Sequence, residues 1–424
     1  MPLDPSLDIV ARWNGGDPQH AALLREAGVT AVLLQENAAS LRDACRNAGI
    51  QTPPVGAIHF LALRDLDTAG PRSAVALSDG LWPGIARGPN TTSDETASPS
   101  REPWVDSNGY WIAYLRALYP DRAPLLGYEP DLKDRLVPFD SLELALIEAW
   151  VAGGNYVLTV EPRYLRALLG GDPAARQAWN QLGRTTRWLR EHAALFRGRA
   201  TMPTITALVE KGAATAEIAN LLSRRNASPA LAPAADPPSP DSRRLALVAA
   251  NLAPPPAAIR ARILAHAEAG SSVILAGRSW WSELLPKPAR SEADRDYHAL
   301  GRGRVIAYRK PVADPSEFAL DVIDIVTHKR RAMRIWNAPA AIAFATDAPP
   351  GKGKALLHVI NYGSPIDSES ELQARIQGHF AKPLCCVRKP RHSRSSPPAA
   401  AQPPKSSSRS SLAWEWWFSS KLAA

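Results

Sequence analysis

Acidic side chains follow several short apolar stretches in the first half of the chain. Asp79 follows SAVALS, Glu129 follows APLLGY, Glu161 follows YVLTV, and Asp106 lies in EPWVDSNGYW ahead of a helical pattern. Carboxyl groups that lie at strand ends in a cleft can donate a proton to a substrate or accept one from it. A second, ionised carboxylate can stabilise positive charge that develops on the reacting substrate. We therefore take these four residues as the candidate catalytic groups.

Aromatic and polar side chains accompany these carboxylates along the sequence. Flat aromatic faces suit the C–H faces of a sugar ring, whose hydroxyl groups need polar partners. The sequence thus predicts a carbohydrate as substrate or ligand. The candidate substrate-binding residues are Trp13, Asn14, Trp82, Trp104, Asn108 and Arg163.

Each of these residue types also has a structural interpretation. Asp106 and its neighbour Ser107 could cap the helix that follows, and Asp79 could shape a turn. Glu129 and Glu161 each precede a proline, so each marks a strand end and could pair with an arginine. The tryptophans could lie in the core. The sequence leaves both interpretations open.

The elements that would position these residues alternate between strand and helix. We expect strands at 7–14, 29–36, 55–61, 73–80, 123–129 and 156–161, and helices at 18–28, 37–49, 107–120, 141–154 and 173–195. Repeated strand–helix units favour parallel strands with helices outside them. The pattern predicts an α/β fold with a (β/α) barrel-like domain at 1–198. Because this length is short for eight units, the barrel is expected to be incomplete or degenerate.

Further α/β units follow the barrel-like part. Apolar strands at 204–211, 243–251 and 271–277 alternate with helices at 215–226 and 254–270, which predicts a flavodoxin-like, doubly wound domain at 199–331. In GRGRVIAYRK (301–310) the glycines precede a strand, whereas a dinucleotide fingerprint places them between a strand and a helix. No cysteine–histidine spacing suits zinc. We therefore expect no cofactor and no metal.

The C-terminal part changes composition twice. AAIAFATD and ALLHVINYG alternate around APPGKGK, which predicts a hairpin and a partial, truncated β-sandwich at 332–380. The segment 381–424 is rich in Ser, Pro and Arg and has no periodicity. Shifted by one frame, its codons can encode alternating apolar and polar residues. We expect a frameshifted, disordered basic tail, which the DNA sequence of the gene would test.

The charge of the chain is concentrated in that last segment. The net charge is +9, and 381–424 holds eight Lys or Arg residues and one acidic residue, which amounts to +7. The body is close to neutral, so the charge does not predict a nucleic-acid partner. No apolar run approaches the roughly 18 residues of a membrane span. MPLDPSLDIVARW shows no signal-peptide pattern, and localisation stays open.

The predicted order of domains resembles the β-galactosidase-like glycoside hydrolases of clan A type. The stretches EAWVAGGNYVLTVEP, LGRGRVIAYRK and LLHVINYGS carry this resemblance. It implies a retaining mechanism with two glutamates about 5 Å apart, here Glu129 as acid/base and Glu161 as nucleophile, with Asp79 or Asp106 as alternates. It also implies a glutamine-amidotransferase-like middle domain that supports homo-oligomers, and a cytoplasmic or exported bacterial protein.

Two departures from the pattern of that family support an alternative. Glu129 and Glu161 lie one strand–helix unit apart, which places them on neighbouring strands, and Tyr128 stands where the family has asparagine before the acid/base. The alternative is a catalytically inactive carbohydrate-binding or assembly protein on a degenerate barrel. Carboxyls that face one cleft would favour the enzyme, whereas carboxyls paired with arginine or pointing apart would favour the inactive protein.

Overall fold

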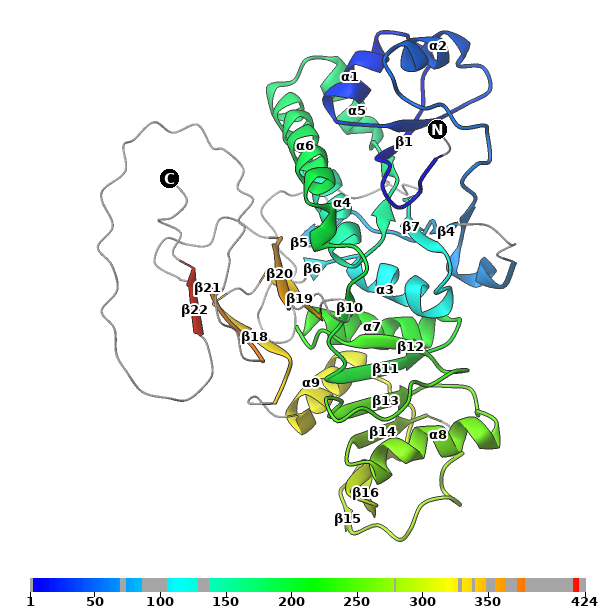
Figure 1. Cartoon of the computed structure of the whole chain (residues 1–424), viewed down its shortest axis with the longest axis vertical. Coiled ribbons are helices and arrows are strands. Elements are labelled where there is room, and N and C mark those ends of the chain that lie inside the picture. Colours follow the sequence, from blue (N-terminus) through cyan, green and yellow to red (C-terminus); the bar gives the residue numbers. More distant parts are fainter. Residues whose placement is uncertain are drawn as a thin grey trace, which may run out of the picture.

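Short parallel strands form a barrel-like arrangement in the N-terminal part of the computed structural model (Figure 1). The structure describes residues 3–68, 74–85, 105–128, 137–277, 280–326, 330–337, 340–347, 355–362, 372–377 and 415–418. Glu129 and Trp104 lie outside these residues. The prediction of a mixed α/β fold with parallel strands is confirmed.

Two parallel sheets meet at two consecutive short strands, β8 and β9, and so make the barrel-like arrangement. One sheet has the order β2-β1-β9 and the other the order β3-β4-β7-β8. Strands β8 and β9 are separated only by Val157, so the two sheets continue into each other. Gln51 adds a parallel bridge to Ala31 on the far side of β2. The strands are β1 (Val10–Trp13), β2 (Ala31–Leu34), β3 (Phe60–Leu61), β4 (Ala74–Leu77), β7 (Ala123–Leu126), β8 (Asn155–Tyr156) and β9 (Leu158–Thr159).

Helices pack against these strands, and their ends follow local sequence rules. They are α1 (His20–Glu26), α2 (Ala39–Asn47), α3 (Gly109–Leu118), α4 (Ser141–Val151), α5 (Pro162–Leu169) and α6 (Pro173–Glu191). The side chain of Asp172 accepts a hydrogen bond from the backbone N–H of Ala175, and Pro173 occupies the first turn of α6. Gly183 lets α6 approach α1 closely, because a Cβ there would lie 2.1 Å from the carbonyl oxygen of Glu26.

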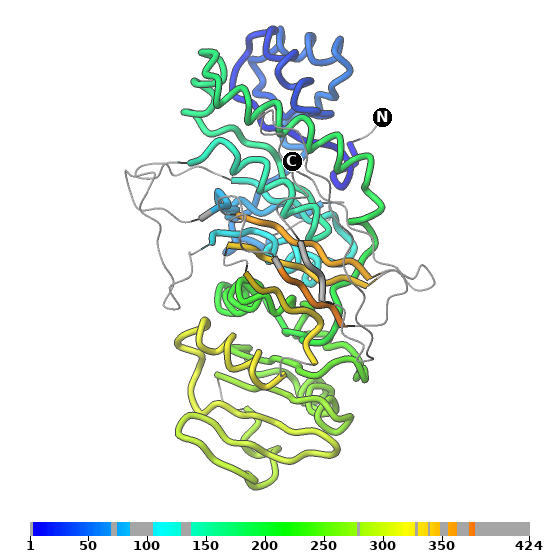
Figure 2. Tube along the Cα trace, turned by 90° about the vertical axis from the view of Figure 1, so that its left-hand side faces the viewer, coloured from blue at the N-terminus to red at the C-terminus, as the bar shows by residue number. Residues whose placement is uncertain are grey.

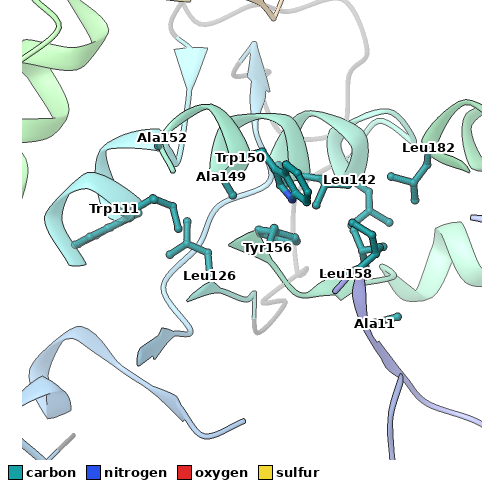
Figure 3. Packing of buried hydrophobic residues seen from close by; sticks show 14 of the residues in the cluster. Ala11, Trp111, Leu126, Leu142, Ala149, Trp150, Ala152, Tyr156, Leu158 and Leu182 are labelled. Atoms are coloured by element: carbon teal, nitrogen blue, oxygen red, sulfur yellow. The ribbon is translucent and has the colours of Figure 1, made fainter. Parts of the chain in front are cut away.

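Large aromatic and aliphatic side chains fill the space between strands and helices. Trp150 on α4 and Tyr156 on β8 are fully buried and lie beside Leu142 and Leu158 (Figure 3). The indole N–H of Trp150 donates to Asn155 Oδ1 at 3.0 Å, and Asn155 Nδ2 donates to the carbonyl of Asp8 at 2.8 Å. This amide thus ties the first residues of the chain to β8.

A seven-stranded sheet forms the second large unit. Its order is β12-β11-β13-β14-β17-β16-β15, with parallel pairing from β12 to β17 and antiparallel pairing beyond. Strands β11 (Ile205–Val209) and β13 (Ala246–Ala250) are buried at every position, as expected for parallel strands covered on both faces. The others are β12 (Ala230–Pro233), β14 (Ser272–Ala276), β15 (Arg290–Ser291), β16 (Arg295–Leu300) and β17 (Gly303–Tyr308).

Helices cover both faces of this sheet (Figure 1). Side chains of α7 (Ala213–Arg224) and α9 (Pro315–Val326) share one apolar cluster with the sheet, and those of α8 (Ala257–Glu268) share another. On its outer side α7 also packs against α3, so the sheet and the barrel-like part are in direct contact. The seven-stranded sheet and its helices were expected to form a flavodoxin-like or glutamine-amidotransferase-like domain, and this identity stays a prediction.

The C-terminal strands lie across the junction of the two units (Figure 2). Strand β19 (Ala341–Asp347) pairs with β10 (Ala200–Thr201) and β20 (Leu356–Asn361). Strand β18 (Met333–Trp336) pairs with β21 (Leu372–Ile376), and β21 pairs with β22 (Glu415–Phe418). The last strand falls within the segment expected to be disordered. The rest of 381–424 lies outside the described residues, and the frameshift and the truncated sandwich stay predictions.

Candidate functional site

Asp79 lies at the end of a barrel strand, as the sequence predicts. It follows β4, is exposed, and its backbone forms an antiparallel bridge with Tyr128, which follows β7. Asp79 Oδ2 accepts a hydrogen bond from the backbone N–H of Leu63 at 2.9 Å. The adjacent strand ends therefore place Asp79 next to the residue that precedes Glu129. Glu129 itself lies outside the described residues.

Glu161 is a buried helix cap. Its side chain is 2% exposed and follows β9. Oε2 accepts a hydrogen bond from the backbone N–H of Tyr164 at 2.9 Å, and Oε1 accepts one from Arg163 Nε at 3.1 Å. With Pro162 in the first turn, these bonds begin helix α5, which the sequence analysis missed. The residues E-P-R-Y were an available signal, because an acceptor followed by proline is typical of a helix start.

Asp106 faces the second unit. It lies in β6 (Val105–Asp106), and its carboxylate is 3.5 Å from a guanidinium nitrogen of Arg224 on α7. Only 13% of the Asp106 side chain and 9% of the Arg224 side chain are exposed. The expected cap of α3 is wrong, since the residue before α3 is Asn108 and no side chain caps it. Asp106 is therefore half of a nearly buried ion pair between units.

Asn108 is fully buried and belongs to a polar cluster that the sequence analysis missed. Its Oδ1 accepts from the backbone N–H of Leu81 at 2.6 Å, and its Nδ2 donates to the carbonyl of Leu81 at 3.0 Å. It also donates to Glu148 from its backbone N–H at 3.0 Å and from Nδ2 at 3.1 Å. The Tyr362 hydroxyl donates to the same carboxyl group.

Glu148 has a strongly altered acidity. It lies on α4 with no exposed surface. Burial raises its pKa to about 8, although the bonds from Tyr362 and Asn108 and the positive charge of Arg224 act in the opposite direction. The available signal was one acidic residue inside the otherwise apolar segment ALIEAWV. The enclosed carboxyl group is thus held by hydrogen bonds from Asn108 and Tyr362.

The two described tryptophans of the predicted sugar platform are core residues. Trp13 is 1% exposed, donates from Nε1 to His20 Nδ1 at 3.1 Å, and packs 6.0 Å from the ring of Trp179. Trp82 is 3% exposed and packs edge-on against Tyr128 at 4.9 Å. Both rings are buried, which agrees with the core interpretation, and their role in stacking on a ligand stays a prediction.

The remaining predicted binding residues that the structure describes follow two neighbouring parallel strands, β1 and β9. Asn14 is exposed at the end of β1. Arg163 is 39% exposed and bonded to Glu161. Trp104 lies outside the described residues. In the part of the chain that the structure describes, no group of three His, Cys, Asp or Glu side chains could hold a metal ion, and no helix is both long and apolar enough to cross a bilayer.

The comparisons with known proteins give structural neighbours alone. No protein-family model matches the sequence, and no curated protein matches it. An α-L-fucosidase, isoenzyme 2 from Paenibacillus thiaminolyticus, aligns with 11% identity and a TM-score of 0.46 over 80% of this chain and 64% of its own. A catalytic mutant of a GH42 β-galactosidase from G. stearothermophilus aligns with 11% identity and a TM-score of 0.47 over 80% of this chain and 60% of its own.

A third neighbour is the β-galactosidase from Bacillus circulans sp. alkalophilus. It has 7% identity and a TM-score of 0.47 over 71% of this chain and 55% of its own. The structural neighbours are thus glycoside hydrolases, the class that the sequence resembles, and the chain spans less than two thirds of their lengths. Similarity at this level carries no argument about the activity of this chain.

Proposed function

We propose that the chain is a catalytically inactive assembly protein built on a degenerate (β/α) barrel. The observation that carries this proposal is the position of Glu161. Both of its carboxylate oxygens accept hydrogen bonds, from Tyr164 N–H and Arg163 Nε, and its side chain is 2% exposed. A nucleophile must reach the sugar carbon, and this carboxylate is held inside the start of a helix instead.

The environment of Asp106 supports the same proposal. Its partner Arg224 belongs to α7, on the second unit, so the carboxylate faces an interface between units and not a strand-end cleft. Removing this carboxylate would take a charge partner away from a nearly buried guanidinium, which is costly. A carboxylate in that position is poorly placed to reach a substrate.

Assembly is favoured over carbohydrate binding by the positions of the aromatic rings. A sugar-binding platform needs an open ring face, and Trp13 and Trp82 are enclosed by Trp179 and Tyr128. The polar cluster around Glu148 instead joins α4 to Tyr362 beyond β20. We infer that the barrel holds the seven-stranded sheet and the C-terminal strands in position. Association of copies through the region 199–331 is supported only by the resemblance to β-galactosidase-like glycoside hydrolases.

One observation favours hydrolysis as a second candidate function. The backbone bridge between Asp79 and Tyr128 places Asp79 beside the strand end that continues into Glu129. Asp79 is exposed, so a substrate could reach its carboxylate, whereas the carboxylate of Glu161 is buried. In this alternative Glu129 and Asp79 form the acid pair, and Glu161 retains its capping role.

A substitution series separates these functions. The wild type, Glu129→Gln, Asp79→Asn and Glu161→Gln would be assayed with a panel of aryl glycosides. We expect no turnover in any of the four proteins. Turnover that both Glu129→Gln and Asp79→Asn abolish, with unchanged circular dichroism, would establish the hydrolase; turnover lost only in Glu161→Gln would contradict the capping role as its sole function.

The oligomeric state of the protein tests whether copies of the chain associate. Size-exclusion chromatography with light scattering should give a mass that is a multiple of 45.8 kDa. A protein that remains monomeric across the concentration range would contradict association through 199–331. The matched control is Glu161→Gln, which alters the barrel-like part alone and should leave the mass unchanged.

A further inference from the structure

A small cavity lies where the barrel-like part, the seven-stranded sheet and the C-terminal strands meet. Its volume is about 20 Å³, which exceeds the roughly 10–15 Å³ that one water molecule requires. The elements around it are α3, the end of α4, α7, β10, β19 and β20 (Figure 1). These elements are distant from one another in sequence, so the cavity exists only in the assembled fold.

The polar lining of this cavity is cationic. Arg116 of α3, Arg199 ahead of β10, and His358 of β20 line it together with Ser223, Thr201 and Thr346. No acidic residue is among the described residues that line it. The site therefore presents two guanidinium groups, an imidazole and hydroxyl groups to one enclosed space, which suits an anion.

Arg116 provides the strongest reason for a counter-ion. Its guanidinium group donates to the carbonyl oxygens of Ala152 and Arg199, both at 2.9 Å. These acceptors are neutral, and burial alone lowers the pKa of Arg116. A buried cation is expensive unless an opposite charge compensates it. Among the described residues no ion pair supplies such a charge to Arg116.

Arg199 and His358 complete the site. Arg199 Nε donates to Thr346 Oγ1 at 3.0 Å. Burial lowers the pKa of Arg199, although the carboxylate of Asp347 acts in the opposite direction, and that carboxylate is itself 2.7 Å from Arg243. The His358 ring stacks on Phe196 at 5.4 Å, and its buried Nε2 has no hydrogen-bond partner in the described part of the chain. A neutral imidazole protonated at Nε2 can donate one bond.

We propose that this junction binds one small monatomic anion of the chloride type between Arg116, Arg199 and His358. The cavity volume sets the size limit, since about 20 Å³ suits an ion of roughly the size of one water molecule. The anion would neutralise the charge on Arg116 and bridge α3 to β20. It would thereby fasten the C-terminal strands to the barrel-like part.

The test uses the full chain in sodium gluconate, whose anion is too large for the cavity. Sodium chloride replaces gluconate at constant ionic strength while the thermal midpoint and the ³⁵Cl NMR line width are followed. We expect a saturable rise in the midpoint and a saturable broadening of the line. Arg199→Gln should weaken the apparent chloride affinity by about tenfold or more, and Arg199→Lys should retain part of it.

The matched control is Arg304→Gln, because Arg304 is an exposed arginine on β17 outside the cavity. It should keep the chloride response of the wild type. A linear response that is equal for chloride and gluconate, or unchanged in Arg199→Gln, would overturn the proposal. Displacement of chloride by equimolar phosphate would overturn the assignment of a monatomic ion.

A second measurement covers the outcome that Arg199→Gln does not fold. Crystals of the wild-type chain would be soaked in sodium bromide, and the anomalous difference map calculated. A bromide peak within hydrogen-bond distance of the Arg116 and Arg199 guanidinium groups supports the site. A map without a peak in the cavity overturns it.

Discussion

The carboxyl group of Glu148 accepts a hydrogen bond from the hydroxyl group of Tyr362, a residue 214 positions further along the chain. Glu148 lies on a barrel helix, and Tyr362 follows the C-terminal strand β20. Both side chains are buried, and Asn108 donates two further hydrogen bonds to the same carboxyl group. One buried group thus connects segments that the sequence separates widely.

Tyr362→Phe should destabilise the protein by about 1–2 kcal/mol, because it removes a donor to a buried carboxyl group and leaves packing almost unchanged. Urea unfolding followed by circular dichroism measures the loss. Tyr156→Phe is the matched control, since the buried Tyr156 hydroxyl has no hydrogen-bond partner among the described residues, and this change should be neutral or slightly stabilising. Equal losses in the two variants would contradict the role of the Tyr362 bond.

The raised pKa of Glu148 predicts a pH dependence of stability. The pKa rises from an ordinary value of 4.5 to about 8 in the folded protein. Between these values the folded state retains a proton that the unfolded chain has released, so the free energy of unfolding falls as the pH rises from about 4.5 to about 8. The total fall from this group is on the order of a few kcal/mol.

Glu148→Gln should remove that fall. The variant cannot ionise at this position, so its stability relative to the wild type should increase as pH rises from 5 to 8. Urea unfolding at four pH values measures this difference. His358, whose pKa burial lowers to about 4, contributes in the opposite direction between about 4 and 6.5, and it does so in both proteins. A difference that stays constant with pH would show that Glu148 is ionised in the fold.

Glu161→Ala should cost about 0.5–2 kcal/mol, because the start of α5 loses the acceptor for Tyr164 N–H. Asp172→Ala is the matched comparison, since Asp172 caps α6 through Ala175 N–H in the same way and has no proposed role in a site. Thermal unfolding measures both. A gain in stability for Glu161→Ala would contradict the capping role, because functional carboxylates are the ones whose removal commonly stabilises a protein.

The ion pair of Asp106 and Arg224 should couple the barrel-like part to α7. A double-mutant cycle with Asp106→Asn and Arg224→Gln should give a coupling energy of about 0.5–3 kcal/mol, measured by urea unfolding. The exposed pair Arg46 and Asp43 on α2 is the control, since its side chains are 60% and 74% exposed and it should contribute less than about 1 kcal/mol. Zero coupling for Asp106 and Arg224 would contradict a stabilising role of this ion pair.

The sequence predicted the positions of helices and strands better than it predicted which residues a given side chain contacts. The helix expected at 173–195 is α6 at Pro173–Glu191, and the apolar stretch of the strand expected at 29–36 is β2. By contrast, the strand expected at 55–61 is confined to Phe60–Leu61. Trp13 was interpreted as a ligand platform because a residue at a strand end can face either the core or the solvent, and spacing along the chain does not distinguish the two.

The sequence by itself determined where strands and helices alternate, because apolar periodicity and capping residues act over a few neighbouring positions. It also located acidic residues at strand ends. Only the tertiary structure decided that Asp106 meets Arg224 and that Glu148 accepts a bond from Tyr362, whereas the cap that Glu161 forms is local and had a sequence signal. The roles of Asp106 and Glu148 depend on partners or on burial that arise when distant segments pack together, and such contacts leave little trace in local sequence.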